Sequence, residues 1–591
     1  MSMCPPRSSS RLATLVVFAV FLLAGVAQAQ TITGSITGTV VDSSGAIVPG
    51  SKVTVTNEAT GAERTLITTE NGVFIFTNLV PTTYSVKIEQ PGFRPVTRTA
   101  LTLTSGDRLA LGSIQLEVGQ TSEAISVTSE VAALNTESAD VTATLGTSQI
   151  SDLVVKGRDF MNLVKLLPGV AQQGGGDVAG GTFGVQSPSV GGIRAVYNNL
   201  TLDGARGNDP GGPAFFSTGV AVDALSEIKI VTSAYLAETG PNPGASIKLT
   251  TKSGTRDFHG TAYAFKRDKA FNANDFFVNR QGLSAFPYRL TTAGAAVGGP
   301  IYIPGKFNAD RSKLFFFWNT EITQSLLPAG LTANAPPAVL RYTVPTALER
   351  QGDFSQTLDT NGQLIVIKDP TTDLPFLNNK IPANRINSNG QKLLSVFPLP
   401  NIADRSFTGG LYNYQFKNFQ DTPKQSHTLK FDIVPNLKDT ISLRLKKWES
   451  DTRSWTGIFS YNNFPLTFYD YDFTHDDALV GWTRVITPSL VNEFTFSATG
   501  SKEDGTPRPG RDQTSVLRQT YGITLGQLFP GSNPRNLLPQ MSFTGISNPV
   551  LFTQDRRAPI QASEEFGEIM DNLSGSFHKF TNVFFSGGDE G

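Results

Sequence analysis

The chain has 591 residues, which is too long for one hydrophobic core, so about two to four domains are expected. Its formal net charge of −1, with 17% charged residues, gives no basic excess for nucleic-acid binding and no acidic solvating tail. The single cysteine, Cys4, lies in a segment that we expect to be removed, which excludes disulfides and thiol chemistry from the mature chain.

The N-terminus has the pattern of a secretory signal peptide. Arg7 and Arg11 precede the apolar run Leu12–Val26, which is shorter than the roughly 18–20 residues that span a bilayer as a helix. Small residues then define a cleavage site between Ala29 and Gln30. We predict that residues 1–29 are a cleaved signal peptide; the alternative is a retained anchor helix. No later stretch is long and apolar enough to span a membrane as a helix, so a membrane location would require a β-barrel.

Residues 30–117 are expected to form a small all-β domain. Turn sequences recur at short spacing, and the segments between them alternate apolar and polar residues. The apolar residues that share a face include Val53 and Val55, Phe74 and Phe76, and Tyr84, Val86 and Ile88. Alternation with period two between turns predicts an Ig-like β-sandwich.

Within this domain, the stretches Gly38–Gly50, Gly72–Phe76 and Leu79–Tyr84 resemble the carboxypeptidase-regulatory-like domain. The resemblance is to an accessory sandwich, and no zinc ligands or peptidase residues stand at these positions. It implies a role in spacing, stability or partner contact.

Residues 118–148 are rich in Ser, Thr and Glu and are expected to be a linker. One segment within it resembles the TonB box, which a periplasmic energy-transducing protein captures as an added strand: Glu123, Ala124, Ile125, Ser126, Val127 and Thr128. Strand addition requires an accessible segment of good β-propensity, and this segment has it. The alternative is an ordinary first strand of the next domain.

Residues 149–254 are expected to form a small α+β domain. The spacing of its apolar residues predicts an amphipathic helix over Gly157–Leu167, stopped by Pro168-Gly169. Extended segments follow at Asn199–Ala205, Ile228–Val231 and Ser246–Thr251, and the last leads directly into Lys252-Ser253-Gly254. This order resembles the plug domain of TonB-dependent outer-membrane receptors.

The plug-like region contains two glycine-rich loops. Residues 174–184 lack the Lys-Ser/Thr spacing of a phosphate-binding loop. The loop 203–213 carries Arg206 and Asp209, which the plug resemblance makes candidates for facing a ligand. The alternative is that both loops are ordinary surface loops.

Residues 255–591 hold most of the phenylalanines and all four tryptophans. In the clearest hairpin, between Thr428 and Lys446, one face carries Leu429, Phe431 and Ile433 and the other carries Thr428, Lys430 and Asp432. Such alternation predicts an antiparallel transmembrane β-barrel, although the pattern alone does not say which face meets lipid. The irregular stretches near 325–425 and 501–560 are expected to be extracellular loops or poorly ordered.

Residues for catalysis or metal binding are not found in suitable patterns. The four histidines do not occur in metal-binding spacing, and no nucleophile-elbow motif is present. His475-Asp476-Asp477 could contact a metal, but an isolated polar triplet is more often solvated. We therefore predict no enzyme activity, no metal and no cofactor.

Taken together, the signal peptide, sandwich, plug and barrel resemble the Oar-like TonB-dependent receptors. The resemblance implies a mainly β protein of the Gram-negative outer membrane, in contact with lipid, which imports an extracellular ligand with a periplasmic TonB-type partner. It also implies a barrel of about 22 strands, whereas residues 255–591 supply about 10–14, so we expect an incomplete barrel and a fragment of a longer receptor.

Two other functions are compatible with the sequence. One is an outer-membrane structural or adhesion protein without energised transport. The other is a secreted multi-domain β protein, which would appear in the soluble fraction. Proline substitution at Ile125 and Val127 separates the first from a transporter, because only transport requires capture of the box.

Overall fold

The computed structural model describes residues 33–119, 125–128, 141–153, 155–171, 185–209, 215–233, 244–274, 276–280, 284–328, 339–417, 419–455, 469–487, 490–507, 517–552, 560–577 and 580–587. Within these ranges the chain is mostly strand, as predicted. None of the helices in this part of the chain is both long and apolar enough to cross a membrane.

The N-terminal unit is a β-sandwich. One sheet has the order β4 (Val73–Leu79), β1 (Gly34–Asp42), β7 (Arg108–Leu116). The other has the order β3 (Glu63–Ile67), β2 (Lys52–Asn57), β5 (Thr82–Glu89), β6 (Val96–Leu103), β8 (Ile125–Thr128). The alternating apolar residues of the sequence fill its core, among them Val53, Val55, Phe74, Phe76, Tyr84, Val86 and Ile88. The predicted sandwich is therefore confirmed.

The second unit is the small α+β domain predicted to be a plug, and we call it the plug below. Its five-stranded sheet has the order β14 (Ala205–Arg206), β13 (Asn199–Leu202), β17 (Ser246–Thr251), β16 (Leu225–Ser233), β9 (Val141–Gly146). The short elements around the sheet are α2 (Thr147–Asp152), η1 (Lys156–Arg158), α3 (Phe160–Val164), β10 (Val170–Ala171), β11 (Val185–Gln186), β12 (Ser189–Val190), η2 (Ala195–Tyr197), β15 (Phe215–Phe216) and η3 (Val222–Ala224).

Two details of the plug differ from the sequence expectation. The helix begins only at Phe160, because Gly157 adopts a left-handed conformation and the Asp159 side chain caps the helix by accepting from Met161 N. The end of the expected linker, Val141–Gly146, is not free but pairs antiparallel with β16 as an edge strand of the plug sheet.

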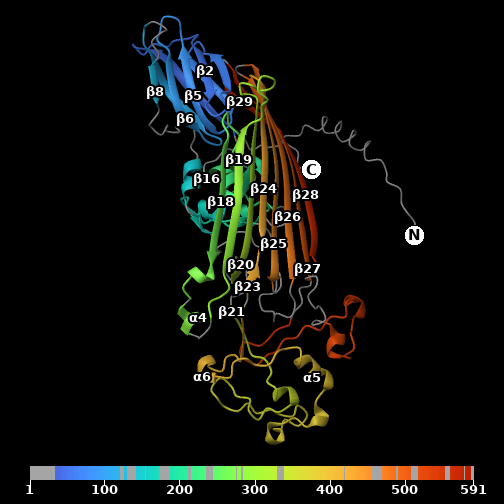
Figure 1. Cartoon of the computed structure of the whole chain (residues 1–591). Coiled ribbons are helices and arrows are strands. Elements are labelled where there is room, and N and C mark those ends of the chain that lie inside the picture. The colour runs from blue at the N-terminus through green and yellow to red at the C-terminus, as the bar shows by residue number, and fades with distance from the viewer. Residues whose placement is uncertain are drawn as a thin grey trace, which may run out of the picture.

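The third unit is a ten-stranded sheet that forms the barrel wall. Its strands are β18 (His259–Asp268), β19 (Arg289–Pro300), β20 (Leu314–Pro328), β23 (Phe419–Asp421), β24 (Lys424–Asn436), β25 (Asp439–Trp455), β26 (Tyr469–Thr487), β27 (Leu490–Pro507), β28 (Ile560–Phe577) and β29 (Phe580–Gly587). Neighbouring strands are antiparallel. The sheet stays open between β18 and β29, in agreement with the prediction of an incomplete barrel. Figure 1 shows the wall beside the plug.

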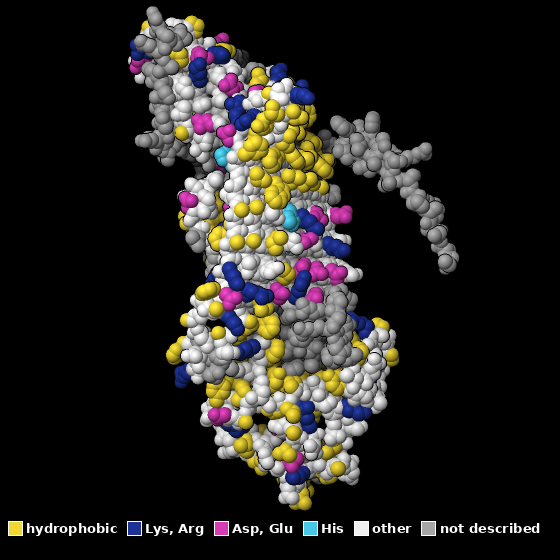
Figure 2. Space-filling view, viewed as in Figure 1, with side chains coloured by type: hydrophobic (Ala, Val, Ile, Leu, Met, Phe, Trp, Pro, Cys, Tyr) yellow, Lys and Arg dark blue, Asp and Glu magenta, His cyan; other side chains and the backbone are white. Residues whose placement is uncertain are grey.

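The structure settles which face of the wall is polar. Thr428 and Lys430 on β24 are buried. Leu429 and Phe431, which alternate with them along the strand, are partly exposed on the opposite face. Leu445 and Phe496 are among the exposed apolar side chains of the wall. On the face shown in Figure 2, apolar side chains gather at the sandwich end of the wall, and charged side chains follow farther along. The polar face therefore meets the plug and the apolar face points away from it.

The long loops opposite the sandwich are folded. Residues 339–417 and 517–552 form one unit, which we call the cap, at the other end of the wall (Figure 1). It contains β21 (Val339–Tyr342), η6 (Glu349–Gln351), η7 (Leu377–Asn379), η8 (Ala383–Arg385), α5 (Ser388–Leu394), α6 (Arg405–Thr408), β22 (Tyr414–Lys417), η10 (Arg518–Tyr521) and η11 (Pro530–Ser532). Val344, Phe397, Val550 and Phe552 are part of its hydrophobic core. Of the two expectations for these stretches, poor order is wrong for these residues, because apolar side chains from both loops are buried against each other. That the loops are extracellular stays a prediction. Between β18 and β19 lie η5 (Lys269–Phe271) and α4 (Phe276–Arg280).

Candidate functional site

One buried ion cluster joins the plug to the wall at Arg444 of β25. Its guanidinium donates to Asp203 Oδ2 of the plug at 2.9 Å and to both carboxylate oxygens of Asp477 on β26 at 2.7 and 2.8 Å. It also donates to the Leu202 carbonyl at 2.5 Å, and the Arg444 side chain is fully buried. Such bidentate, charge-assisted contacts are the strong ones.

Asp203 is positioned by a tight turn at the end of β13. It has a positive φ of 50° and is followed by Gly204, with φ 92°, so the chain reverses where the carboxylate leaves the strand. Thr251 of β17 donates to Asp203 from its backbone N at 2.8 Å and from its hydroxyl at 2.6 Å. Burial opposes ionisation of Asp203, but the charges of Lys430 and Arg444 and the bonds from Thr251 outweigh it and lower the pKa to about 2.

A second ion cluster between the plug and the wall lies at Arg158. Its guanidinium pairs with Asp223 of η3 and with Glu321 Oε2 of β20, the latter at 3.2 Å. It also lies over the rings of Tyr263 and Phe265 on β18, 4.3 and 4.8 Å from their centroids. Tyr263 donates to Glu321 at 2.7 Å. One plug side chain thus contacts two wall strands.

Close apolar packing supplements these ion clusters. The plug core is continuous with the wall residues Phe317, Trp448, Tyr471 and Phe473. At Gly219 a Cβ would lie 2.4 Å from Trp448 Nε1, so this glycine permits a close approach of plug to wall. The plug is therefore held against the wall by a mixture of apolar packing and buried charges.

The turn Thr104–Asp107 of the sandwich contacts the plug. Glu227 of β16 accepts from Ser105 N at 3.0 Å, and Lys229 donates to the Ser105 carbonyl and to Asp107 Oδ1, both at 2.6 Å. Burial raises the pKa of Glu227 to about 7, although Ser105 N and Lys229 favour its charged form. Sequence reasoning missed this contact. Its signal was the alternation of Glu227 and Lys229 with Ile228 and Ile230, which marks a polar strand face.

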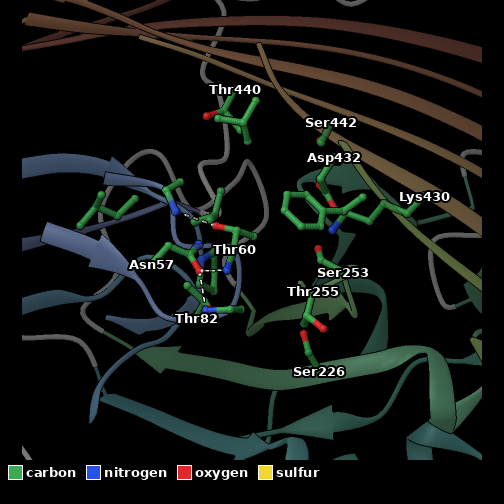
Figure 3. Close-up of a pocket in the computed structure, with 18 of the residues that line it drawn as sticks. Asn57, Thr60, Thr82, Ser226, Ser253, Thr255, Lys430, Asp432, Thr440 and Ser442 are labelled. Atoms are coloured by element: carbon green, nitrogen blue, oxygen red, sulfur yellow. Dashed lines mark hydrogen bonds between the residues drawn. The ribbon is translucent and has the colours of Figure 1, made fainter. Parts of the chain in front are cut away.

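A cavity of about 1260 Å³ lies where the sandwich, plug and wall meet. Figure 3 shows Asn57, Thr60 and Thr82 of the sandwich on one side, and Lys430 and Asp432 of β24 with Ser253 of the plug on the other. Its lining combines hydroxyl, amide and charged side chains with a larger share of apolar surface. The sandwich, the plug and the wall thus all contribute polar groups to this cavity, which lies on the sandwich side of the plug.

The structure places the predicted plug-loop residues against the wall. The Arg206 guanidinium lies 5.3 Å from the centroid of the Phe566 ring on β28. Asp209 is only 6% exposed, and the neighbouring Asn208 is fixed by bonds to Leu200 N and the Asn198 carbonyl. Residues 210–214 lie outside the described part of the chain. That Arg206 and Asp209 face a ligand remains a prediction.

Other predicted residues are only partly covered. Ile125, Ser126, Val127 and Thr128 form β8, which pairs with β6 of the sandwich, while Glu123 and Ala124 lie outside the described residues. The predicted cleavage site, Ala29 and Gln30, also lies outside them. In the triplet considered for metal binding, Arg444 occupies both carboxylate oxygens of Asp477, and the Nδ1 of His475 lies 3.0 Å from the Ser501 hydroxyl.

Comparison with known proteins gives two domain matches. Residues 250–580 match the family of outer membrane beta barrel domains, and residues 35–117 match the carboxypeptidase regulatory-like domain. Over 317 residues the chain is 25% identical to a TonB-dependent transporter, Oar, of Myxococcus xanthus; the match covers 51% of this chain and 28% of that protein.

Solved structures with a similar arrangement are also transporters and receptors. The outer membrane transporter YddB of Escherichia coli has 10% identity and a TM-score of 0.42, with 75% of this chain and 46% of that chain covered. The siderophore receptor PirA of Acinetobacter baumannii has 9% identity and a TM-score of 0.38, with 76% and 47% covered. The chain thus spans less than half the length of each of these proteins. The relative in Myxococcus xanthus is named as a transporter, in agreement with the prediction of no catalysis.

Proposed function

Because the chain belongs to the family of outer membrane beta barrel domains, we propose that it acts in the outer membrane as a TonB-dependent receptor. In this proposal an extracellular ligand binds on the cap side of the plug. A periplasmic TonB-type protein then pulls on the box segment, and rearrangement of the plug admits the ligand to the cavity beneath it.

The observation that carries the proposal is the attachment of the plug. The plug is folded against the polar face of the wall, and buried charges at Arg444 and Arg158 contribute to its attachment. A purely structural plug is served better by apolar packing, since a well-packed hydrophobic replacement for a buried ion pair is often as stable. Charged contacts can be exchanged for water, which suits a plug that moves and returns. The similarity to a TonB-dependent transporter also supports a role in transport.

The experiment measures whether the plug moves when it is energised. Ser217, 2% exposed in the plug, is replaced by cysteine in the full-length receptor, and cells are treated with a membrane-impermeant maleimide. Transport predicts labelling that requires the TonB-type protein and is lost in the Ile125→Pro/Val127→Pro variant. As controls, Leu528→Cys, at a cap position that is 92% exposed, is labelled equally in all strains, and Ala133→Pro preserves the labelling of Ser217→Cys.

The competing function is an outer-membrane structural or adhesion protein without energised transport. The folded cap is the observation that favours this competing function. A compact unit with its own core, at the end opposite the sandwich, is a suitable surface for contacts outside the cell. This function predicts that labelling of Ser217→Cys is the same with and without the TonB-type protein. That result would overturn the transport proposal.

A further inference from the structure

Four of the six residues of the box candidate, Ile125–Thr128, form a strand in this structure. Ile125–Thr128 forms β8, which pairs in parallel with β6 of the sandwich, so that Val96 lies opposite Ile125 and Thr99 opposite Thr128. Within the expected linker, these four residues therefore have a defined place in a sheet. The segment is held by the sandwich and not by the plug.

The path of the preceding chain explains this pairing. After β7, the Arg94 N bonds to the Glu117 carbonyl at 2.8 Å, and the Gly119 N bonds to the Gly92 carbonyl at 3.2 Å. These bonds fix Gly119 beside the start of β6, and Ile125 then lies opposite Val96 at the same end. Because the chain enters β8 at the end where β6 begins, the two strands run parallel.

The strand that holds the box is itself well anchored. β6 pairs with β5 on its other side, and Val96, Leu101 and Leu103 are buried in the sandwich core. A bulge at this pairing, with φ 58° at Ala100, ends the straight part of β6 just after the last residue opposite β8. The straight part of β6 therefore ends where its pairing with β8 ends.

β8 is the last strand of its sheet. Within the described ranges it pairs with no strand other than β6, so the backbone groups on its other edge point away from the sheet. An unpaired edge is a template for the addition of a further strand. The sandwich lies at the end of the wall opposite the cap (Figure 1), which under the proposed function is the periplasmic end.

We propose that the sandwich presents the box as its edge strand, and that an extended strand of the periplasmic TonB-type protein pairs with the free edge of β8 as the sixth strand of the sheet. This inference rests on the proposed function. It assigns the sandwich a role in recognition, because a strand that is already ordered binds without a further ordering cost. It differs from sequestration, in which the partner has to detach β8 from β6 before it can bind.

A reversible disulfide separates the two mechanisms. Thr97 and Ser126 are opposed across the β6–β8 pair, and neighbouring strands lie about 4.8 Å apart, a spacing that a disulfide spans. The full-length receptor with Thr97→Cys and Ser126→Cys is titrated with the purified periplasmic domain of the TonB-type protein. The titration is made once with the receptor oxidised and once after the receptor has been reduced. If the sandwich presents the box, the dissociation constants of the oxidised and the reduced receptor should agree within about threefold, because the disulfide leaves the outer edge of β8 free.

Sequestration predicts the reverse: the oxidised receptor binds at least about tenfold more weakly, and reduction restores binding. That outcome overturns the inference and leaves the proposed function intact. If the wild-type receptor does not bind the periplasmic domain at all, the proposed function fails instead. The single variants Thr97→Cys and Ser126→Cys, under the same oxidation, show that any effect comes from the bond between the strands.

Hydrogen exchange on the wild-type receptor tests the inference without any substitution. On addition of the periplasmic domain, presentation predicts slower exchange of the amides of Ile125–Thr128 and unchanged exchange of those of Val96–Thr99. Faster exchange along Val96–Thr99 shows that β8 has left the sheet and contradicts the inference.

Discussion

At the residue scale, two arginines of the same strand have contrasting environments. Arg444 is fully buried and binds Asp203 and Asp477, whereas Arg453, farther along β25, pairs with Asp451 at 3.6 Å and its side chain is 45% exposed. Both are Arg–Asp pairs, but only the first is out of water. A buried charge that loses its partner stays uncompensated, while an exposed one is solvated.

We therefore expect Arg444→Met to destabilise the receptor by about 3–5 kcal/mol, because it leaves two buried carboxylates without their cation. The matched variant Arg453→Met should change the stability by about 0–1 kcal/mol. Both stability changes are measured by thermal unfolding of the plug, with hydrogen exchange of the amides of Asn199–Leu202 as the readout. Equal effects of the two variants would contradict the argument.

Gly254 is a residue at which only a hydrogen atom fits. A Cβ there would lie 2.4 Å from the Phe316 carbonyl oxygen and 2.9 Å from the Gly299 carbonyl oxygen, and both atoms are backbone. Gly254→Ala should therefore displace the plug–wall connection and cost about 1–3 kcal/mol. Gly531→Ala, where a Cβ meets nothing within 4 Å, is the matched control and should leave the melting temperature unchanged.

At the scale of elements, the Thr104–Asp107 turn of the sandwich docks on β16 of the plug through buried charged groups. Glu227 and Lys229 are 6% and 4% exposed, and Asp107 and Lys248 are the other charged groups that act on Glu227 there. The pKa of Glu227 is raised to about 7 in the docked state, from the ordinary 4.5, chiefly by burial. Docking of the sandwich therefore takes up a proton at this carboxyl.

Docking should consequently be strongest below about pH 4.5, weaken as the pH rises from 4.5 to 7, and stay constant above that window. Glu227→Gln should abolish this dependence. Exchange of the Ser105–Asp107 amides, corrected for the intrinsic pH effect, measures docking. Glu89→Gln, at a sandwich surface pair with Lys87, is the control and should keep the wild-type pH profile.

At the scale of the whole molecule, the sandwich and the cap lie at opposite ends of the wall (Figure 1). The cap has a hydrophobic core of its own, distinct from the one that the plug shares with the wall. Units with separate cores open separately. The cap should therefore unfold without loss of the plug or the wall.

Phe552→Ala tests this, because Phe552 is 1% exposed and belongs to the cap core. Removing a buried phenylalanine costs about 3–5 kcal/mol, which should speed amide exchange in residues 339–417 and leave β26 protected. Leu528→Ala, at a cap position that is 92% exposed, should change neither region. Parallel loss of protection in β26 would show that cap and wall form one cooperative unit.

The sequence by itself determined the elements whose signal is local. Alternating residues in the sandwich and in the Thr428–Lys446 hairpin fix strands, because side chains on a strand alternate between its two faces. Glycine and proline marked the turns. The order of sandwich, plug and wall was readable for the same reason, as each has its own pattern over tens of residues.

Only the tertiary structure decided which distant groups meet. The polar face of the wall is buried because the plug covers it, and Arg444 is neutralised by Asp203, which lies 241 positions earlier in the chain. The cap core draws apolar residues from two loops, neither of which shows a periodic pattern. The β-propensity of Ile125–Thr128 was visible in the sequence, but the sheet that it joins was not, since strand pairing depends on where the folded sandwich offers an open edge.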